Sequence, residues 1–174
     1  MLLTGSFPRL LDDKLRFAIP KPLRDAIGID QSILFVVPGT EGSLALYPDD
    51  TFHRLADRME QRVANGRDLA AFNRLFYAQA QRIECDKQGR LRLPIELAEL
   101  AGLQKEIILL GVRDHLEIWN RERWENYLDQ TQPHYDEIAS RVLAGGTTPP
   151  APISTVDQVL SSPADVQARP GHPR

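Results

Sequence analysis

The stretch "ECDKQGRLRLP", Glu84–Pro94, decides the fold. It places acidic residues, a glycine and a proline around what reads as the start of a strand. Alternation in "RLRLP" puts Leu91 and Leu93 on one face of that strand and Arg90 and Arg92 on the other. The closing proline ends the strand and can open a helix at its first turn. The stretch therefore predicts a charged turn, a short half-buried strand and a helix.

A related stretch, "LLDDKLRFAIP", occupies Leu10–Pro20. Asp12 and Asp86 are 74 positions apart, and the same offset relates Arg16 to Arg90, Pro20 to Pro94, Leu23 to Leu97 and Gly28 to Gly102. Further along, an offset of 72 relates Tyr47 to Trp119 and Phe52 to Trp124. The chain therefore contains an internal repeat, and each copy reads as turn, strand, helix, hairpin and helical segment.

The repeat predicts how the chain is organised. Strands of a few residues and one short helix bury little apolar surface, so the two copies are expected to interlock as a pseudo-twofold unit. Beyond Gly145 the chain is rich in Pro, Ser, Thr, Ala and Gly, which predicts a disordered tail in which only "ISTVDQVL" could order on a partner. The expected segments are a first repeat over 1–52, a helical connector over 53–80, a second repeat over 81–124, C-terminal helices over 125–144 and the tail over 145–174.

Composition bounds the class of protein. The chain has 174 residues, 42% hydrophobic and 26% charged, and a net charge of −3, as expected for a soluble globular protein. Its apolar runs have the length of buried strands, and its N-terminus has no signal-peptide pattern, so we expect no membrane association. Cys85 is the single cysteine, which rules out an intramolecular disulfide and suits a reducing cytoplasm; we expect a small core or edge residue.

Enzymatic chemistry finds little support in the sequence. The four histidines, His53, His115, His134 and His172, are scattered without metal-ligand spacing. No glycine-rich phosphate loop follows a strand. Asp114 and His115 are adjacent in a predicted hairpin turn, but nothing nearby supplies a nucleophile or an orienting group. The sequence therefore predicts no enzyme, no cofactor, no metal site and no small-molecule substrate.

Local charge points to nucleic acid, although the whole chain is mildly acidic. Basic residues gather around both motif strands, and arginine can fork onto phosphate or guanine. A two-stranded ribbon can also enter the major groove of DNA. The predicted DNA contacts are Arg9, Lys14 and Arg16 in the first copy and Lys87, Arg90 and Arg92 in the second. The alternative is that Arg16 and Arg90 pair with Asp12 and Asp86 and hold the turns.

The two turns differ at one position. Gly89 allows a positive φ in the second turn, whereas Leu15 takes that place in the first. A left-handed leucine costs about 1–2 kcal/mol. We therefore expect the first turn to have changed shape, and the second motif, with Asp86 and Gly89, to be the main DNA-reading element.

The doubled motif, "DDKLRFAIP" (Asp12–Pro20) and "DKQGRLRLP" (Asp86–Pro94), resembles that of the MraZ family. The resemblance covers roughly residues 1–143 and implies a β-rich α+β fold, in which two tandem SpoVT/AbrB-type swapped-hairpin repeats form a pseudo-twofold barrel with peripheral helices. It implies a bacterial, cytoplasmic, nucleoid-associated transcription factor. Such a protein would bind promoter direct repeats upstream of the division and cell-wall gene cluster, including its own promoter, would generally repress it, and would assemble into a ring-shaped homo-oligomer.

Two other readings stay open at this point. The net charge of −3 and Leu15 would also suit a ring-forming scaffold that has lost DNA binding. An antitoxin-like module with "ISTVDQVL" as its partner-binding segment is the third possibility. Binding to DNA should weaken steeply with salt, because each neutralised phosphate releases counterions, whereas a scaffold would show no such dependence.

Overall fold

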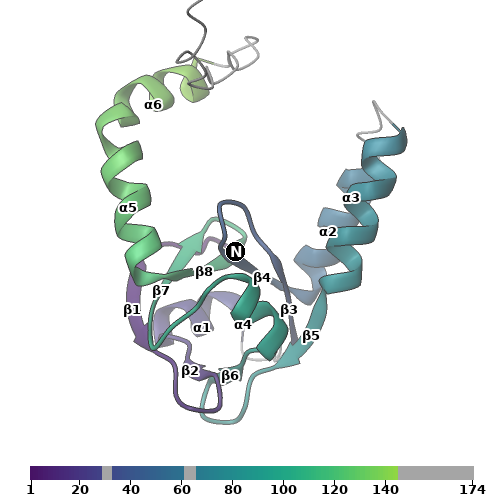
Figure 1. The fold of residues 1–174 in the computed structure, drawn as a ribbon, viewed down its shortest axis with the longest axis vertical. Helices are drawn as coiled ribbons and strands as arrows, with labels where there is room; N and C mark the ends of the chain where they lie inside the picture. Colours follow the sequence, from purple (N-terminus) through teal and green to yellow (C-terminus); the bar gives the residue numbers. More distant parts are fainter. Residues whose placement is uncertain (29–32, 61–65, 145–174) are drawn as a thin grey trace, which may run out of the picture. The chain divides into compact units, whose positions relative to one another are not determined.

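The computed structural model describes residues 1–28, 33–60 and 66–144, and its elements follow one order twice. The first copy comprises β1 (Ser6–Leu10), β2 (Arg16–Ala18), α1 (Lys21–Ile27), β3 (Ile33–Pro38), β4 (Leu44–Pro48), α2 (Asp49–Glu60) and α3 (Gly66–Gln79). The second comprises β5 (Gln81–Glu84), β6 (Arg90–Arg92), α4 (Ile95–Leu100), β7 (Glu106–Val112), β8 (His115–Asn120), α5 (Arg121–Thr131), a 3-10 turn (Gln132–His134) and α6 (Tyr135–Leu143) (Figure 1).

The main sheet is built from strands of both copies. Its six antiparallel strands run in the order β1-β7-β8-β4-β3-β5. The first strand of each copy therefore pairs with the hairpin of the other copy, and the two hairpins meet where β4 pairs with β8. The predicted strand-rich α+β class is confirmed. The described strands do not close into the predicted barrel, because β1 and β5 remain as two edges.

The two motif strands form a separate ribbon. β2 and β6 pair antiparallel, with Arg16 opposite Arg92 and Phe17 opposite Leu91. Phe17 and Leu91 are buried, whereas Arg92 is exposed, so the alternation expected for this strand is confirmed. Burial of one face is what holds so short a ribbon in register, because a slip of one residue would turn its apolar side chains outward.

The main core lies between this ribbon, the sheet and the two short helices. Leu23 of α1 and Leu97 of α4 are each 2% exposed and belong to the same buried cluster as Phe17 and Leu91. Both helices begin directly after a proline, Pro20 or Pro94, as the sequence predicts. The position of each helix relative to the ribbon is therefore set by a buried leucine and a helix-opening proline.

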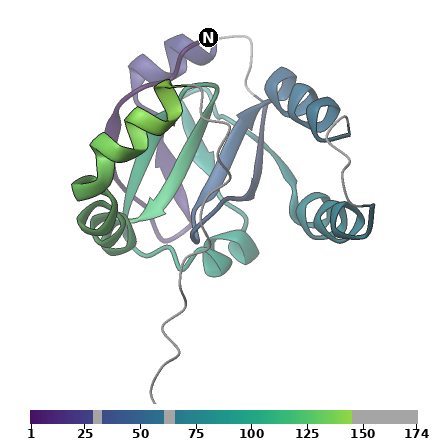
Figure 2. The ribbon, with the colours of Figure 1, turned by 90° about the horizontal axis from the view of Figure 1, so that it is seen from above.

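Two smaller clusters anchor the longer helices. Phe52 of α2 stacks on Phe35 with ring centroids 4.4 Å apart, and Trp124 of α5 meets Trp119 edge-on at 5.3 Å. Figures 1 and 2 show the α2–α3 pair and α5 on opposite sides of the strands. These helices extend away from the end of the sheet that carries the β2–β6 ribbon (Figure 1). The ribbon end is therefore left uncovered by the longer helices.

A charged cluster links the β7–β8 turn to α2. His115 lies 3.0 Å from Asp114 and 3.5 Å from Glu117, and its ring stacks on Tyr47 at 4.7 Å. Arg58 of α2 approaches Asp114 at 3.7 Å. Burial alone would lower the pKa of His115, but hydrogen bonds and charge from Glu117 and Asp114 raise it. The pair Asp114–His115 is thus part of an ion-pair network between elements.

The contacts divide the chain into two compact units, with the boundary between Tyr135 and Asp136. The second unit contains nearly all of α6, whose exposed apolar residues include Val142 and Leu143. Among the helices of the described residues, none is both long and apolar enough to cross a bilayer. The tail predicted over 145–174, including "ISTVDQVL", lies outside the described residues.

Candidate nucleic-acid interface

Both motif turns are shaped by an aspartate that accepts hydrogen bonds from the backbone. Oδ1 of Asp12 accepts the backbone N–H groups of Lys14 and Arg16, both at 2.9 Å. Oδ1 of Asp86 accepts those of Gln88 at 2.8 Å and Arg90 at 2.9 Å. An aspartate side chain that caps its own turn in this way fixes the local backbone without help from the rest of the fold.

The arginine that follows each turn is paired with the same aspartate. Nε of Arg16 donates to Oδ2 of Asp12 at 2.8 Å, and Nε of Arg90 donates to Oδ2 of Asp86 at 2.8 Å. This is the pairing that the alternative reading of these arginines predicts. Their side chains still expose 36% and 40% of their surface. Each arginine therefore serves the turn first, and only its remaining N–H groups are free to meet a ligand.

The prediction that the first turn differs in shape from the second is wrong. Leu15 has φ 57° and Gly89 has φ 75°, so leucine takes up the same left-handed conformation as glycine. The carbonyl of Leu15 accepts the N–H of Leu93 at 2.9 Å, and the carbonyl of Gly89 accepts that of Ile19 at 2.9 Å. These bonds between the copies, the Asp12 side chain and packing of Leu15 against the core outweigh its backbone cost.

A second difference between the copies accompanies the difference between Leu15 and Gly89. The side chain of Arg24 on α1 lies over Gly89, so that a Cβ at Gly89 would come within 2.7 Å of Cδ of Arg24. The repeat offset pairs Arg24 with Ala98 on α4, and Ala98 and Leu15 line the same groove. One copy thus combines a small turn residue with a large helix residue, and the other reverses the sizes.

The remaining predicted contacts fall into two groups. Arg9 on β1 is held by the protein: its Nε donates to the carbonyl of Ala18 at 3.2 Å, and its guanidinium lies 5.8 Å from the ring centre of Phe7. Lys14, Lys87 and Arg92 are exposed, and among the described residues their side chains form no hydrogen bond or ion pair. Figure 1 shows both motif turns beside the β2–β6 ribbon at one end of the structure.

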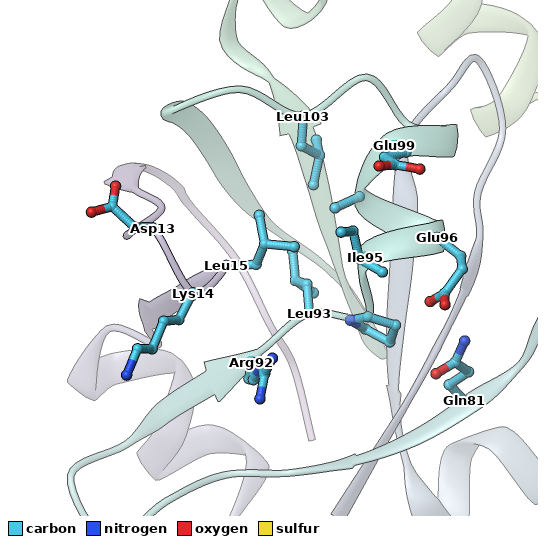
Figure 3. Close-up of a pocket in the computed structure, with 12 residues that line it drawn as sticks. Asp13, Lys14, Leu15, Gln81, Arg92, Leu93, Ile95, Glu96, Glu99 and Leu103 are labelled. Atoms are coloured by element: carbon cyan, nitrogen blue, oxygen red, sulfur yellow. The ribbon is translucent and has the colours of Figure 1, made fainter.

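Two grooves flank the ribbon, each between the turn of one copy and the short helix of the other. The groove beside α4, of about 600 Å³, has an apolar middle formed by Leu15, Leu93 and Ile95 (Figure 3). The groove beside α1, of about 560 Å³, is lined by Lys21, Arg24 and Lys87 among others. We name them the α4 groove and the α1 groove.

Cys85 lines the α1 groove. It is half-buried, packs against the main core, and burial raises the pKa of its thiol. It is therefore the small residue at the edge of the core that the sequence predicts, and its protonated thiol is a poor nucleophile at neutral pH. Within the described residues no group of His, Cys, Asp or Glu side chains is arranged to hold a metal ion.

Lys21 and Arg24 were not among the contacts predicted from the sequence. Both belong to α1, and the prediction concentrated on the turns and strands. The repeat offset offered a signal, since the charged residues Lys21 and Arg24 correspond to the apolar residues Ile95 and Ala98. What the offset does not reveal is that α1 lies beside the second turn rather than the first.

The turn aspartates make stability depend on pH in the acid range. Hydrogen bonds from the side chain and backbone of Arg16 lower the pKa of Asp12 to about 2, and bonds from Arg90 likewise lower that of Asp86. A lowered pKa contributes stability that is complete above the unfolded value of 3.8 and is lost as pH falls through the folded one. We expect the stability difference between the wild type and Asp12→Asn to shrink between pH 4 and pH 2, as measured by urea unfolding. A difference that stays constant over that interval would contradict this assignment.

The sequence matches the family described as "MraZ protein, putative antitoxin-like" over residues 2–72 and 76–144. A protein of Heliobacterium modesticaldum named transcriptional regulator MraZ is 33% identical over 139 residues, which cover 80% of this chain and 95% of that protein. A Pediococcus pentosaceus protein of the same name is 36% identical over 142 residues, 82% of this chain and 97% of the relative. Transcriptional regulators are not a class of enzymes, which agrees with the prediction made from the sequence. The chain therefore belongs to the MraZ family.

Proposed function

We propose that this protein is a sequence-specific DNA-binding transcriptional regulator that contacts DNA through the β2–β6 ribbon and its two turns. The observation that carries the proposal is a ribbon, left uncovered at one end of the structure, with Lys14, Lys87 and Arg92 exposed and unpaired among the described residues. A two-stranded ribbon fits the major groove of DNA, and lysine and arginine bind phosphates. The relatives bear the name transcriptional regulator, which supports the same function.

Each part of the ribbon has a distinct task in this proposal. Asp12, Asp86 and Gly89 shape the turns, and Arg16 and Arg90 hold them while offering their remaining N–H groups to the DNA. The unpaired side chains of Lys14, Lys87 and Arg92 contact phosphates or base edges. Arg9, bound to the carbonyl of Ala18, lies next to the strand that pairs with β6.

The test is a fluorescence-anisotropy titration with DNA from upstream of the protein's own gene and with scrambled DNA, at two salt concentrations. We expect tight binding that prefers the upstream fragment and falls steeply with salt. The variant Lys87→Ala/Arg92→Ala should lose two contacts and weaken binding at least tenfold, taking about 1 kcal/mol for each lost DNA contact. Arg74→Ala, an exposed arginine on α3, is the matched control and should bind as the wild type does.

Equal, weak and salt-insensitive binding to both fragments would overturn the regulator proposal and favour a ring-forming scaffold. The antitoxin-like reading predicts a protein complex that is lost on deletion of the tail over 145–174. That segment lies outside the described residues, so the deletion itself is the test of this reading.

We propose further that the two copies, over 1–52 and 81–124, are tandem SpoVT/AbrB-type swapped hairpins, which the exchange of β1 and β5 between copies supports. We also propose that the protein forms a ring-shaped homo-oligomer. Exposed apolar residues on α3 and α4 support self-association, among them Leu75 at 66% and Ile95 and Leu100 at 56%. Sedimentation velocity should then show one species of several protomers, and a monomer would exclude the ring.

The regulated target follows from family membership as a proposal. We propose that the protein acts in the cytoplasm at the bacterial nucleoid and represses the division and cell-wall gene cluster through promoter direct repeats. Deleting the gene should raise transcripts of that cluster, and unchanged transcripts would remove this part of the proposal without touching DNA binding itself.

A further inference from the structure

The α1 and α4 grooves occupy equivalent places in the two copies, but the net charges of their lining residues have opposite signs. Each lies between a motif turn of one copy and the short helix of the other. In the α4 groove, Figure 3 shows Glu96 and Glu99 on the helix side of the apolar middle, across from Lys14 and Arg92. The α1 groove also has apolar lining residues, Ile19, Ile27 and Leu34, but it differs in charge. Its helix side carries Lys21 and Arg24, and Asp25 is the one acid that α1 adds to its lining.

The difference arises from single exchanges between corresponding helix positions. Lys21 on α1 corresponds to Ile95 on α4, and Arg24 corresponds to Ala98. Glu96 on α4 corresponds to Pro22 on α1, so α4 carries an acid at a position where α1 has none. Asp25 on α1 corresponds to Glu99 on α4, and both acids are exposed.

Three cations converge on the α1 groove. The guanidinium of Arg24 lies over Gly89, and its Nε is buried without a hydrogen-bond partner in the described part of the chain. A buried N–H without an acceptor is costly, and an anionic oxygen is its strongest partner. Lys21 and Lys87 are exposed on either side of the groove and form no bond among the described residues. Asp86 does not oppose an anion strongly, because Arg90 already pairs with it.

We infer that the α1 groove binds a phosphate group of the DNA backbone, held by Lys21, Arg24 and Lys87, and that the α4 groove does not. This inference rests on the proposed DNA-binding function and deepens it, because it gives the two halves of the protein unequal roles. A phosphate contact supplies affinity and positions the protein without reading sequence. The acids of the α4 groove would repel the same phosphate.

The test measures the DNA dissociation constant against salt concentration for single-charge variants of the full chain. Lys21→Gln should weaken binding to the upstream and the scrambled fragments alike and lower the slope of log affinity against log salt by about 1 for each bound protomer. Lys21 is preferred to Arg24 because Arg24 also packs against the turn. Asp25→Asn should tighten binding, whereas its repeat counterpart Glu99→Gln should leave it unchanged.

The outcomes separate this inference from the function on which it rests. If the wild type shows no salt-dependent binding, the proposed function fails. If the wild type binds but Lys21→Gln keeps the full slope, or Glu99→Gln tightens binding as much as Asp25→Asn, the inference fails and the function stands. Calorimetry with inorganic phosphate tests whether the groove binds a free phosphate ion instead of DNA. If Lys21→Gln abolishes phosphate binding but leaves the slope of log DNA affinity against log salt unchanged, the groove is a small-anion site and the DNA assignment is overturned.

Discussion

Leu91→Ala is expected to lower the free energy of unfolding by about 2–5 kcal/mol, the range for removing a buried leucine side chain. Leu91 is fully buried and faces Phe17 across the ribbon. The ribbon has only three residues in each strand, so its position depends on these side chains rather than on many backbone bonds. Urea unfolding at a fixed protein concentration measures the loss, since association would otherwise shift the result.

DNA binding should suffer in the same variant, because the loosened ribbon no longer presents Lys87 and Arg92 in one arrangement. Leu2→Ala is the matched control: this leucine precedes β1 and is 68% exposed, and its removal should change stability by less than about 0.5 kcal/mol. Equal effects of the two substitutions would show that the ribbon does not depend on burial of Leu91.

Gly89→Leu should destabilise the protein by about 2–4 kcal/mol, although leucine occupies the equivalent position in the first turn. Part of the cost, about 1–2 kcal/mol, comes from the left-handed backbone, where Gly89 has φ 75°. The rest comes from overpacking, because the new side chain would collide with the guanidinium of Arg24.

The double variant Gly89→Leu/Arg24→Ala separates these causes. It rebuilds in the second turn the combination that Leu15 and Ala98 form in the first, so the overpacking should disappear and only the backbone cost should remain. Gly102→Leu is the control for that cost, since Gly102 has φ 59° and its nearest neighbour would lie 3.6 Å from a new Cβ. Both variants are measured by urea unfolding. A double variant no more stable than Gly89→Leu alone would refute the size exchange between the copies.

Much of the fold follows from local features of the sequence. Alternation correctly assigns Leu91 to the core and Arg92 to the surface, because the backbone geometry of a strand points successive side chains to opposite faces. Each short helix begins directly after its proline as expected, although Pro20 and Pro94 take the N-cap position with extended backbone rather than a place in the first turn. The repeat itself, visible as a constant offset, predicts two equivalent sets of elements.

The candidate site was predicted less completely. The aspartate–arginine pairing within each turn was foreseen only as an alternative, because both partners lie in one motif and their spacing allows the contact without requiring it. The shape of the first turn was predicted wrongly from Leu15 alone. Its conformation is stabilised by the Asp12 side chain and also by contacts from outside the turn, among them the N–H of Leu93 in the other copy, which donates to the carbonyl of Leu15.

The sequence by itself therefore determines the repeat, the element types, the inward and outward faces of the motif strands, and the family. The tertiary structure decides which helix meets which turn. Arg24 lies over Gly89 and Leu15 shares a groove with Ala98, and both arrangements join residues more than sixty positions apart. Local periodicity carries no information on such contacts. They arise only because β1 pairs with the hairpin of the second copy and β5 with that of the first, which brings each turn beside the short helix of the other copy.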